Sequence, residues 1–330
     1  MKISKVVVIG SGTMGSGIAA QVANAGLQVH LLDLTIEIAT KACERIKKSR
    51  PPLLMEDNNL NHIIPGSIEN DMETLKDADW VVEAVVERID IKKTLYSQID
   101  TLRKPGALVS SNTSSIPLKV LTEDMSKEMK EVFCITHFFN PVRYMRLLEL
   151  VIGPQNDKEK INDLVNFGDK ILGKTVVVCN DSPGFLGNRV GVYAMQVAMT
   201  EAFNLGLTVE EADAVFGRPL GIPKTGIFGL YDLIGIDLMA DVLKSFIKEL
   251  PTSDPFHKVG KELPIINQLI EDGYTGRKGK GGFFRMNKSS DVKILESLDY
   301  KNNTYHESKK VDLSLPDVMD VVNVIERDDV

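Results

Sequence analysis

A glycine-rich stretch, GSGTMG at residues 10–15, constrains the fold of this chain more than any other feature. It closes the apolar run 5–10 and opens a helical pattern over residues 15–25, and a second apolar run, 28–33, follows. A strand that turns tightly into a helix and returns as a neighbouring strand is typical of a dinucleotide-binding βαβ unit. We therefore expect a parallel sheet with a nucleotide at the carboxyl ends of its strands.

The three glycines have separable physical roles. Gly10 permits the tight turn, Gly12 lets the backbone approach a pyrophosphate at the helix N-terminus, and Gly15 allows the helix and strand to pack closely. Asp33 ends the next strand, where its carboxylate can accept both ribose hydroxyls but would repel a 2′-phosphate. Leu34 supplies no cation there, so NAD is predicted rather than NADP. The other predicted contacts of the loop are Thr13 and Met14.

A glycine-rich turn without a ligand is the alternative, but it would not require the strand, helix, second strand and acidic residue together.

Further runs rich in Val, Leu and Ile predict strands at 80–84, 108–112, 133–138, 147–153 and 175–179. Helical patterns such as 35–48 and 89–102 lie between several of them. This alternation predicts a Rossmann-like, doubly wound α/β domain with a mostly parallel sheet over residues 1–181.

The character of the chain changes after residue 181. Strand patterns give way to long helical patterns at residues 185–205, 209–216, 227–250 and 264–272. They predict an all-α second domain over residues 182–284, and 330 residues are enough for about two domains. Residues 285–330 turn polar and end on a weakly apolar run, so we expect a tail or a linker to a further domain.

Composition excludes several classes of protein. The net charge of −7 and the pI near 5.4 argue against a nucleic-acid surface, which requires a basic face. The three cysteines are scattered without metal-ligand spacing and suit reduced thiols. No apolar run reaches the roughly 18 residues of a membrane span, and the N-terminus does not resemble a signal peptide. We therefore expect a soluble cytoplasmic protein without a metal site.

A polar stretch, SSNTSS at residues 110–115, follows a buried-strand pattern. In an open parallel sheet, ligands lie beyond the carboxyl ends of the strands. The side chains of residues 112–115 are therefore predicted to face the nicotinamide. The alternative is that Ser114 or Ser115 caps a helix that begins at Pro117.

His137 and Glu149 are lone polar residues in two apolar strands. A buried carboxylate without a partner is costly, so Glu149 should have one. If the strands pair in an antiparallel register centred on Arg143, His137 lies opposite Glu149. A carboxylate on one imidazole nitrogen fixes the tautomer and makes the other nitrogen a general base, which together with NAD implies alcohol oxidation. A core histidine satisfied by a carboxylate is the alternative.

With these features the chain resembles the L-3-hydroxyacyl-CoA dehydrogenase family from residue 5 to about residue 284. The shared motifs are GSGTMG (10–15), VVEAVVE (81–87), SNTSS (111–115), THFFNP (136–141), DSPGFLGNR (181–189) and GRKGKGGFF (276–284). The resemblance implies an NAD-binding first domain and a helical second domain that dimerises and closes over an acyl-CoA. It implies NAD-dependent oxidation of L-3-hydroxyacyl-CoA to 3-ketoacyl-CoA in fatty-acid β-oxidation.

The resemblance also assigns residues. His137 would be the general base and Glu149 its orienting carboxylate, while Ser114 and Asn188 would hold the substrate's oxygen atoms. Asn140 would lie beside His137 as a supporting polar group. Residues that would contact the nicotinamide half of NAD are Glu87, Lys92, Asn112, Ser114 and Asn140. From the residues alone, Lys92 would be a solvated helix residue, Glu87 a helix-start charge and Asn188 an ordinary helix residue.

Other features extend or limit this interpretation. A basic cluster (Arg45, Lys47, Lys48 and Arg50) occupies the region where the family contacts CoA, although a solvated helix face is the alternative. Residues 224–228, KTGIF, replace the family's common Gly-Pro-Phe turn, which leaves acyl-chain length open. Some relatives fuse the dehydrogenase to a second helical unit and an enoyl-CoA hydratase, so such a partner is a hypothesis for this chain.

Two rival functions remain. A dehydrogenase of free hydroxy acids or sugar acids would use the same fold without CoA. A non-catalytic NAD-binding structural protein would need none of the four residues Ser114, His137, Glu149 and Asn188, whose joint presence argues against it.

Overall fold

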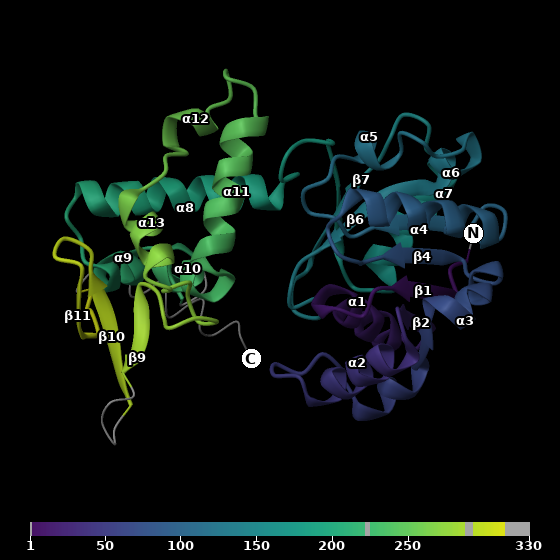
Figure 1. Ribbon diagram of the computed structural model, residues 1–330, viewed down its shortest axis with the longest axis horizontal. Coiled ribbons are helices and arrows are strands. Elements are labelled where there is room, and N and C mark those ends of the chain that lie inside the picture. The colour runs from purple at the N-terminus through teal and green to yellow at the C-terminus, as the bar shows by residue number, and fades with distance from the viewer. Residues whose placement is uncertain (1, 222–224, 288–292, 314–330) are drawn as a thin grey trace. The chain divides into compact units, whose positions relative to one another are not determined.

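A computed structural model describes residues 2–221, 225–287 and 293–313. The chain forms two compact units, Met1–Gly187 and Asn188–Val330 (Figure 1). The unit boundary lies a few residues beyond the predicted boundary at 181. Each unit has its own hydrophobic core, so each is described by itself.

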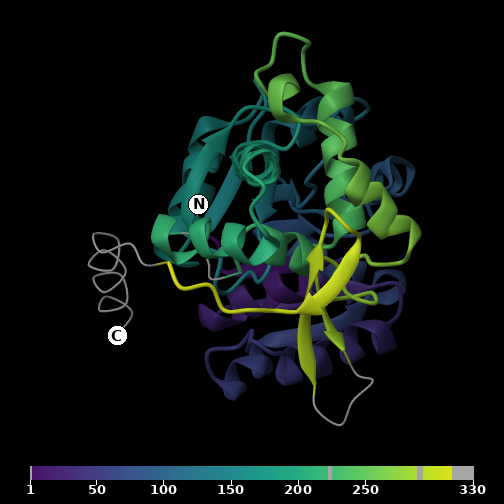
Figure 2. The same ribbon diagram turned by 90° about the vertical axis from the view of Figure 1, so that its left-hand side faces the viewer.

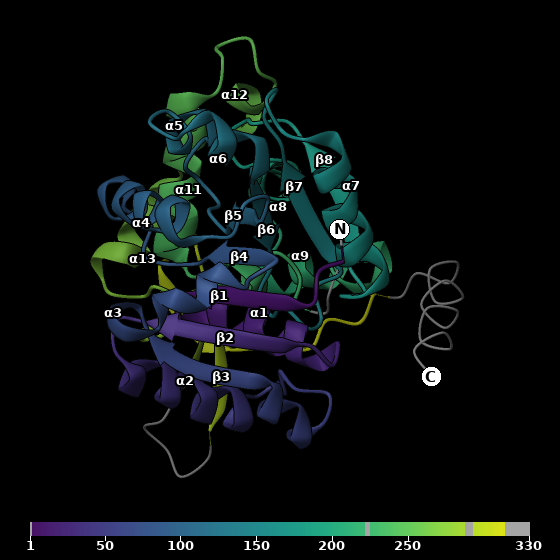
Figure 3. The same cartoon turned by 90° about the vertical axis from the view of Figure 1, so that its right-hand side faces the viewer.

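The first unit contains an eight-stranded sheet in the order β3-β2-β1-β4-β5-β6-β7-β8 (Figure 3). All neighbouring strands are parallel except β6 and β7, which are antiparallel. The strands are β1 (Lys5–Ile9), β2 (Gln28–Asp33), β3 (Ile63–Ser67), β4 (Trp80–Glu83), β5 (Leu108–Ser111), β6 (Phe133–Phe138), β7 (Leu147–Val151) and β8 (Thr175–Cys179). The predicted Rossmann-like, mostly parallel sheet is confirmed.

Helices cover both faces of this sheet, as the alternating burial of β1 requires. Val6 and Val8 pack into one core cluster and Val7 and Ile9 into the other. The helices are α1 (Thr13–Asn24), α2 (Ile36–Lys48), α3 (Ile68–Asp71), α4 (Ile89–Leu102), α5 (Leu118–Leu121), α6 (Lys127–Val132) and α7 (Lys158–Lys170), with short 3₁₀ helices η1 (Asp57–His62) and η2 (Met72–Lys76). Because both faces are buried, the strands read as continuous apolar runs.

One strand of the sheet was not predicted. β3 has the sequence IIPGS, and Pro65 and Gly66 are unfavourable in a central strand. The strand lies at the edge of the sheet, beside β2 alone, where proline is tolerated because one side of the strand has no partner. The proline therefore concealed an edge strand.

The second unit is mainly helical. Its elements are α8 (Gly187–Asn204, beginning at the unit boundary), α9 (Val209–Val215), η3 (Arg218–Leu220), α10 (Phe228–Ile234), α11 (Ile236–Glu249), α12 (Phe256–Val259), α13 (Pro264–Glu271), β9 (Phe284–Asn287), β10 (Ile294–Asp299) and β11 (Thr304–Glu307). The single helix predicted over residues 227–250 is wrong, because Gly235, with a φ of +116°, separates α10 from α11.

Residues 285–330 were predicted as a tail or linker, but the described part of this segment contains strands. β9, β10 and β11 form an antiparallel sheet, drawn in yellow in Figure 2. Tyr300 packs on Phe203 and donates a hydrogen bond to the carbonyl of Leu207, so the sheet is part of the second unit's core. Leu298 is its one large apolar side chain that is fully buried among the described residues, so the apolar alternation that predicts a strand was weak. Residues 314–330 of that predicted segment lie outside the described residues.

The GRKGKGGFF stretch is a structural turn built around Asp232. The Asp232 carboxylate accepts hydrogen bonds from the backbone N–H groups of Phe283 and Phe284, at 2.9 and 2.7 Å. A Cβ at Gly282 would lie 2.0 Å from the Asp232 carboxylate, and one at Gly276 2.4 Å from its carbonyl oxygen. Close packing therefore requires glycine at these two positions.

Within the described ranges, no helix is both long enough and apolar enough to cross a membrane.

Candidate active site

The predicted pairing of His137 with Glu149 is confirmed. β6 and β7 are antiparallel with His137 directly opposite Glu149, and Nδ1 of the imidazole lies 2.6 Å from Oε2 of the carboxylate. Glu149 is completely buried and His137 is 6% exposed. Since the carboxylate accepts the Nδ1–H proton, the neutral ring carries its lone pair on Nε2.

The second oxygen of Glu149 is also fixed. Oε1 accepts hydrogen bonds from the backbone N–H groups of Leu186 and Gly187, at 2.8 and 2.6 Å. Burial alone would raise the pKa of Glu149, but the hydrogen bonds from His137, Gly187 and Leu186 together outweigh it and hold this pKa below its ordinary value. The carboxylate is therefore held in one orientation and in its charged form.

Aromatic rings pack against the imidazole of His137. The ring centroids of Phe139 and Phe185 lie 4.5 and 5.7 Å from that of His137. These contacts limit the rotation of the imidazole. Orientation by Glu149 and packing by the phenylalanines together give a histidine with one defined free nitrogen.

The glycine-rich loop has the geometry that a dinucleotide requires. Gly10 has a φ of +99°, and a Cβ on Gly15 would lie 1.8 Å from the Gly10 carbonyl oxygen. A Cβ on Gly12 would meet nothing within 4 Å, so open space lies beside this residue at the start of α1. Oδ2 of Asp33 accepts hydrogen bonds from the backbone N–H and hydroxyl of Ser11, both at 2.6 Å. These two hydrogen bonds therefore fix the position of Asp33 relative to the loop.

A cavity of about 790 Å³ adjoins this loop. Its lining includes Gly10, Gly12, Thr13, Met14 and Asp33, five of the residues predicted to contact the cofactor, but not Gly15. Further lining residues that were not predicted to contact the cofactor are Leu34, Ile68, Val86, Ile91, Leu95 and Gln98. Apolar walls beside a carboxylate suit an adenine ring next to its ribose, so the residues present fit NAD. Their helical or turn positions carried no separate signal, although the 69% exposure of Leu34 fits a ligand-contacting side chain.

The polar stretch 110–115 divides into buried and exposed parts. The Ser110 hydroxyl accepts hydrogen bonds from Trp80 Nε1 and Thr136 Oγ1, at 2.9 and 2.7 Å, and the Ser111 hydroxyl donates to Glu83. Thr113 is buried, so the prediction that all of residues 112–115 face the cofactor is wrong. Much of this hydroxyl content instead satisfies groups inside the sheet.

The remaining members of the stretch have separate positions. The Asn112 side-chain oxygen accepts the backbone N–H of Phe138, which ties β5 to β6 one residue after His137. Ser115 is exposed and its hydroxyl donates to Glu87 at 3.1 Å. Ser114 is exposed and, among the described residues, its side chain has no hydrogen-bond partner, which leaves it available for a ligand.

Neither Ser114 nor Ser115 caps the following helix. The Asp181 carboxylate accepts hydrogen bonds from the backbone N–H groups of Leu118 and Lys119, at 2.8 and 3.1 Å, at the start of α5. The capping alternative is therefore wrong, because a residue distant in sequence satisfies these N–H groups.

Lys92 is not a solvated helix residue. Its side chain is 1% exposed and its Nζ lies 2.7 Å from a Glu83 oxygen and 3.1 Å from a Glu87 oxygen. Burial raises the pKa of Glu87, but Lys92 together with hydrogen bonds from Thr113 and Ser115 outweighs it and lowers this pKa overall. Glu83 itself was not predicted as a site residue, although a glutamate within the apolar run WVVEAVV was a signal that it needed a partner.

Other predicted residues lie at separate places. Asn140 is exposed on the connection between β6 and β7. Asn188 is half-buried in the first turn of α8, at the start of the second unit. Of the basic cluster, Arg45 lies on α2 with its guanidinium donating to the Ser11 carbonyl oxygen at 3.0 Å, so it is tied to the cofactor loop.

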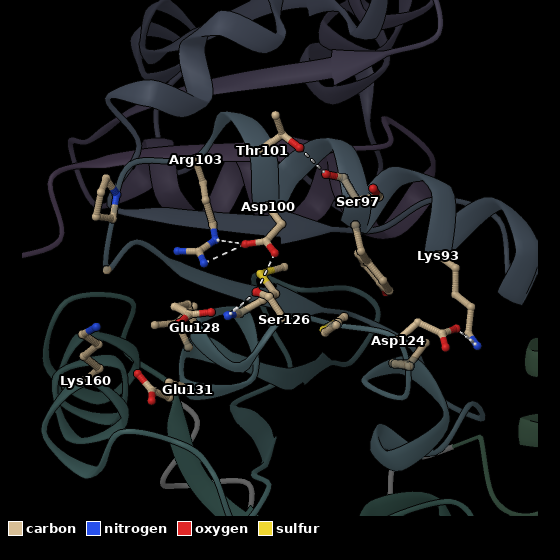
Figure 4. Close-up of a pocket in the computed structure, with 17 residues that line it drawn as sticks. Lys93, Ser97, Asp100, Thr101, Arg103, Asp124, Ser126, Glu128, Glu131 and Lys160 are labelled. Carbon is tan, nitrogen blue, oxygen red and sulfur yellow. Dashed lines mark hydrogen bonds and ion pairs between the residues drawn. The ribbon is translucent and has the colours of Figure 1, made fainter.

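A second cavity, of about 770 Å³, lies beside α4 and α6 (Figure 4). Several of its charged groups pair with each other, including Arg103 with Asp100 and Lys93 with Asp124. It contains none of the predicted site residues. The cavity beside the glycine-rich loop is therefore the better candidate for the cofactor.

Comparison with known families gives two matches that together cover most of the chain. Residues 5–182 match the family description "3-hydroxyacyl-CoA dehydrogenase, NAD binding domain", and residues 184–286 match "3-hydroxyacyl-CoA dehydrogenase, C-terminal domain". NAD is therefore the cofactor of the first domain.

Individual relatives agree with these matches. A putative fatty acid oxidation complex trifunctional enzyme of Rickettsia felis is 43% identical over 95% of this chain, which spans 44% of that protein. A probable 3-hydroxyacyl-CoA dehydrogenase of Deinococcus radiodurans is 36% identical over 89% of this chain and 86% of the relative. The crystal structure of (S)-3-hydroxybutyryl-CoA dehydrogenase from Ralstonia eutropha is 30% identical, has a TM-score of 0.72, and is matched over 85% of this chain and 98% of that chain.

Proposed function

Since the chain belongs to the 3-hydroxyacyl-CoA dehydrogenase family, we propose that it oxidises L-3-hydroxyacyl-CoA to 3-ketoacyl-CoA with NAD. The observation that carries the proposal is the buried His137–Glu149 pair in the same unit as a dinucleotide cavity. A base and a hydride acceptor are the two components that oxidation of an alcohol requires.

His137 takes the proton of the substrate hydroxyl on Nε2, because Nδ1 is already bound to Glu149. Glu149 then lies next to the imidazolium and stabilises its positive charge, while the backbone N–H groups of Leu186 and Gly187 keep the carboxylate from rotating. NAD, when bound, accepts the hydride from C3 of the substrate.

Further residues have proposed contacts with the reactants. The exposed Ser114 hydroxyl donates a hydrogen bond to the substrate oxygen, and Asn188 holds a second substrate oxygen. Asn140 supports the position of His137, and Glu87, Lys92 and Asn112 form the nicotinamide side of the site. The free Ser114 hydroxyl and the anchoring of Asn112 to Phe138 support these assignments.

The CoA part of the substrate has a proposed site on the basic cluster of α2. Lys47, Lys48 and Arg50 are exposed cations at or just beyond the C-terminal end of that helix, and their side-chain charges would attract phosphates. Arg45 is partly engaged with Ser11 and contributes less. Residues 1–181 would hold NAD, and residues 182–284 would bind the acyl chain.

We place the reaction in fatty-acid β-oxidation in the cytoplasm. The Rickettsia felis relative, of which the chain spans 44%, is named a putative fatty acid oxidation complex trifunctional enzyme, and this name supports an associated or fused enoyl-CoA hydratase. The three free cysteines suit a reducing compartment.

A homodimer through the second unit is supported by the exposed apolar side chains Val190 and Tyr193 on α8. Light scattering of the purified chain tests the dimer.

The test of the reaction is NADH formation with L- and D-3-hydroxybutyryl-CoA, longer L-3-hydroxyacyl-CoA thioesters and free 3-hydroxybutyrate. Turnover of L-thioesters alone supports the proposal. Turnover of the free acid at a similar kcat/KM would instead favour a dehydrogenase of free hydroxy acids. NADH binding without turnover of any thioester would favour a structural role.

A further inference from the structure

Glu83, at the carboxyl end of β4, is a buried charged residue of the first unit. Its side chain is completely buried and accepts four hydrogen bonds. The donors are the Lys92 ammonium at 2.7 Å, the Val85 backbone N–H at 2.8 Å, the Tyr96 hydroxyl at 2.5 Å and the Ser111 hydroxyl at 2.6 Å. A buried carboxylate is tolerated when its lone pairs are satisfied in this way.

One branch from Glu83 passes through Lys92. The Lys92 ammonium lies between Glu83 and Glu87, and Glu87 accepts hydrogen bonds from the hydroxyls of Thr113 and Ser115. Glu83 and Lys92 are almost fully inaccessible, whereas the Glu87 side chain is 37% exposed. The branch therefore begins in the core and ends at groups that a ligand can reach.

The other branch from Glu83 passes through Ser111. The Ser111 hydroxyl accepts the backbone N–H of Thr113 at 3.2 Å, and Thr113 in turn accepts the backbone N–H groups of Ser115 and Ile116. The backbone carbonyl of Glu83 also accepts the N–H of Asn112. Both branches thus converge on the 112–115 turn that follows β5.

We propose that Glu83 is a positioning residue for the nicotinamide half of the cofactor site. Glu83 holds Lys92 and Ser111, and these two groups hold the loops that carry Glu87 and Asn112. This inference rests on the proposed function only in assigning those loops to the nicotinamide half. Glu83 does not line the cavity at the glycine-rich loop, although it accepts the backbone N–H of Val85, which does. The Gln oxygen in Glu83→Gln can still accept this N–H, so the adenosine half of the site should keep its shape.

The charge balance explains how a neutral substitution would act. Lys92 has two carboxylate partners, and loss of the Glu83 charge leaves it with Glu87 alone. A buried ammonium then draws the remaining carboxylate more strongly, and Glu87 is the partner that is free to move because it is partly exposed. Glu83→Gln is therefore expected to pull the exposed loop inward while the apolar core of the sheet stays unchanged.

The experiment compares the binding of NADH with that of ADP-ribose, which lacks the nicotinamide. Glu83→Gln is expected to raise the Kd for NADH about tenfold or more and to leave the Kd for ADP-ribose unchanged. Tyr96→Phe is the matched control, because it removes another donor to Glu83 that belongs to neither branch, and it should leave both Kd values unchanged. Both ligands bind without acyl-CoA, so the result does not depend on which substrate is oxidised.

Two results would overturn the inference. Equal loss of NADH and ADP-ribose binding in Glu83→Gln would mean that Glu83 only supports the fold, and unchanged binding of both ligands would mean that it positions nothing. If Glu83→Gln does not fold, Ser111→Ala removes a single donor and should weaken NADH binding selectively, in the same direction. Failure of Ser111→Ala to do so would equally contradict the inference.

Discussion

Glu149 joins His137 to the residues that precede the second unit, since one carboxylate oxygen lies 2.6 Å from Nδ1 and the other accepts the N–H groups of residues 186 and 187. Both carboxylate oxygens of Glu149 therefore have hydrogen-bond partners before any substrate binds. A carboxylate that can only accept hydrogen bonds selects the His137 tautomer with a proton on Nδ1. The proton-accepting nitrogen is then Nε2.

Glu149→Gln should lower turnover by about 10²- to 10⁴-fold while NADH binding stays unchanged. If the Gln oxygen keeps the N–H groups of Leu186 and Gly187, its amide nitrogen faces His137 and donates to Nδ1. That favours the tautomer with a proton on Nε2, which cannot act as a base. Steady-state kinetics and NADH fluorescence measure the two effects, and near-normal turnover would show that Glu149 does not orient the base.

The Glu149 interaction should also make stability depend on pH. The folded-state pKa of Glu149 lies below the ordinary 4.5, so its contribution to stability is present above pH 4.5 and is lost as the pH falls through the folded value. The free energy of unfolding should differ between wild type and Glu149→Gln by about 1–3 kcal/mol at pH 7 and by less in acid. Fluorescence of Trp80, the single tryptophan, reports unfolding of the first unit. A difference that grows in acid would contradict this sign.

Alanine substitution at two glycines of the cofactor loop should affect different properties, NADH binding at Gly12 and stability at Gly15. Gly12→Ala adds a methyl group into open space, so stability should be unchanged while NADH binding weakens about tenfold, or about 1.4 kcal/mol. Gly15→Ala forces a Cβ against the Gly10 carbonyl oxygen and should cost about 1–3 kcal/mol of stability. Thermal unfolding and NADH titration of both variants measure this contrast, and identical behaviour would refute the assigned roles.

Asp33 should determine the preference for NAD over NADP. Replacing Asp33 with Ser and Leu34 with Arg removes the carboxylate and adds a cation at an exposed position beside the cavity. The ratio of kcat/KM for NADP over NAD should rise at least about tenfold. Leu34→Arg alone is the control and should still prefer NAD, because the carboxylate remains. A control that switches preference as fully as the double variant would remove Asp33 from this role.

The sheet and the His137–Glu149 pair were predictable because their signals are local. Two lone polar residues in apolar strands, joined by a short connection, leave few registers in which both side chains are satisfied. The requirement that Glu149 have a partner predicted the antiparallel register in which His137 lies opposite it. By contrast, β3 was missed because Pro65 and Gly66 conceal an edge strand.

The buried network around Glu83 was not predictable from residue spacing. Lys92 occupies a helix whose sequence is ordinary, and its burial depends on how α4 packs against β4 and β5. The Asp181 carboxylate likewise accepts hydrogen bonds from the N–H groups at the start of α5, although it lies more than 60 positions away in the sequence. Such tertiary contacts, and the apolar cavity wall that includes Ile68 and Ile91, exist only after the helices have packed.

The assignment of His137 as the general base is tested most directly by NADH formation from L-3-hydroxybutyryl-CoA, or from a longer thioester if the wild type prefers it, in His137→Gln. Glutamine keeps a polar side chain but has no basic nitrogen, so turnover should fall about 10²- to 10⁴-fold. The Kd for NADH should stay at the wild-type value, because the proposed role of His137 is to accept the proton of the substrate hydroxyl and not to contact NAD. A His137→Gln variant that turns over at a near-normal rate would contradict the assignment of the general base.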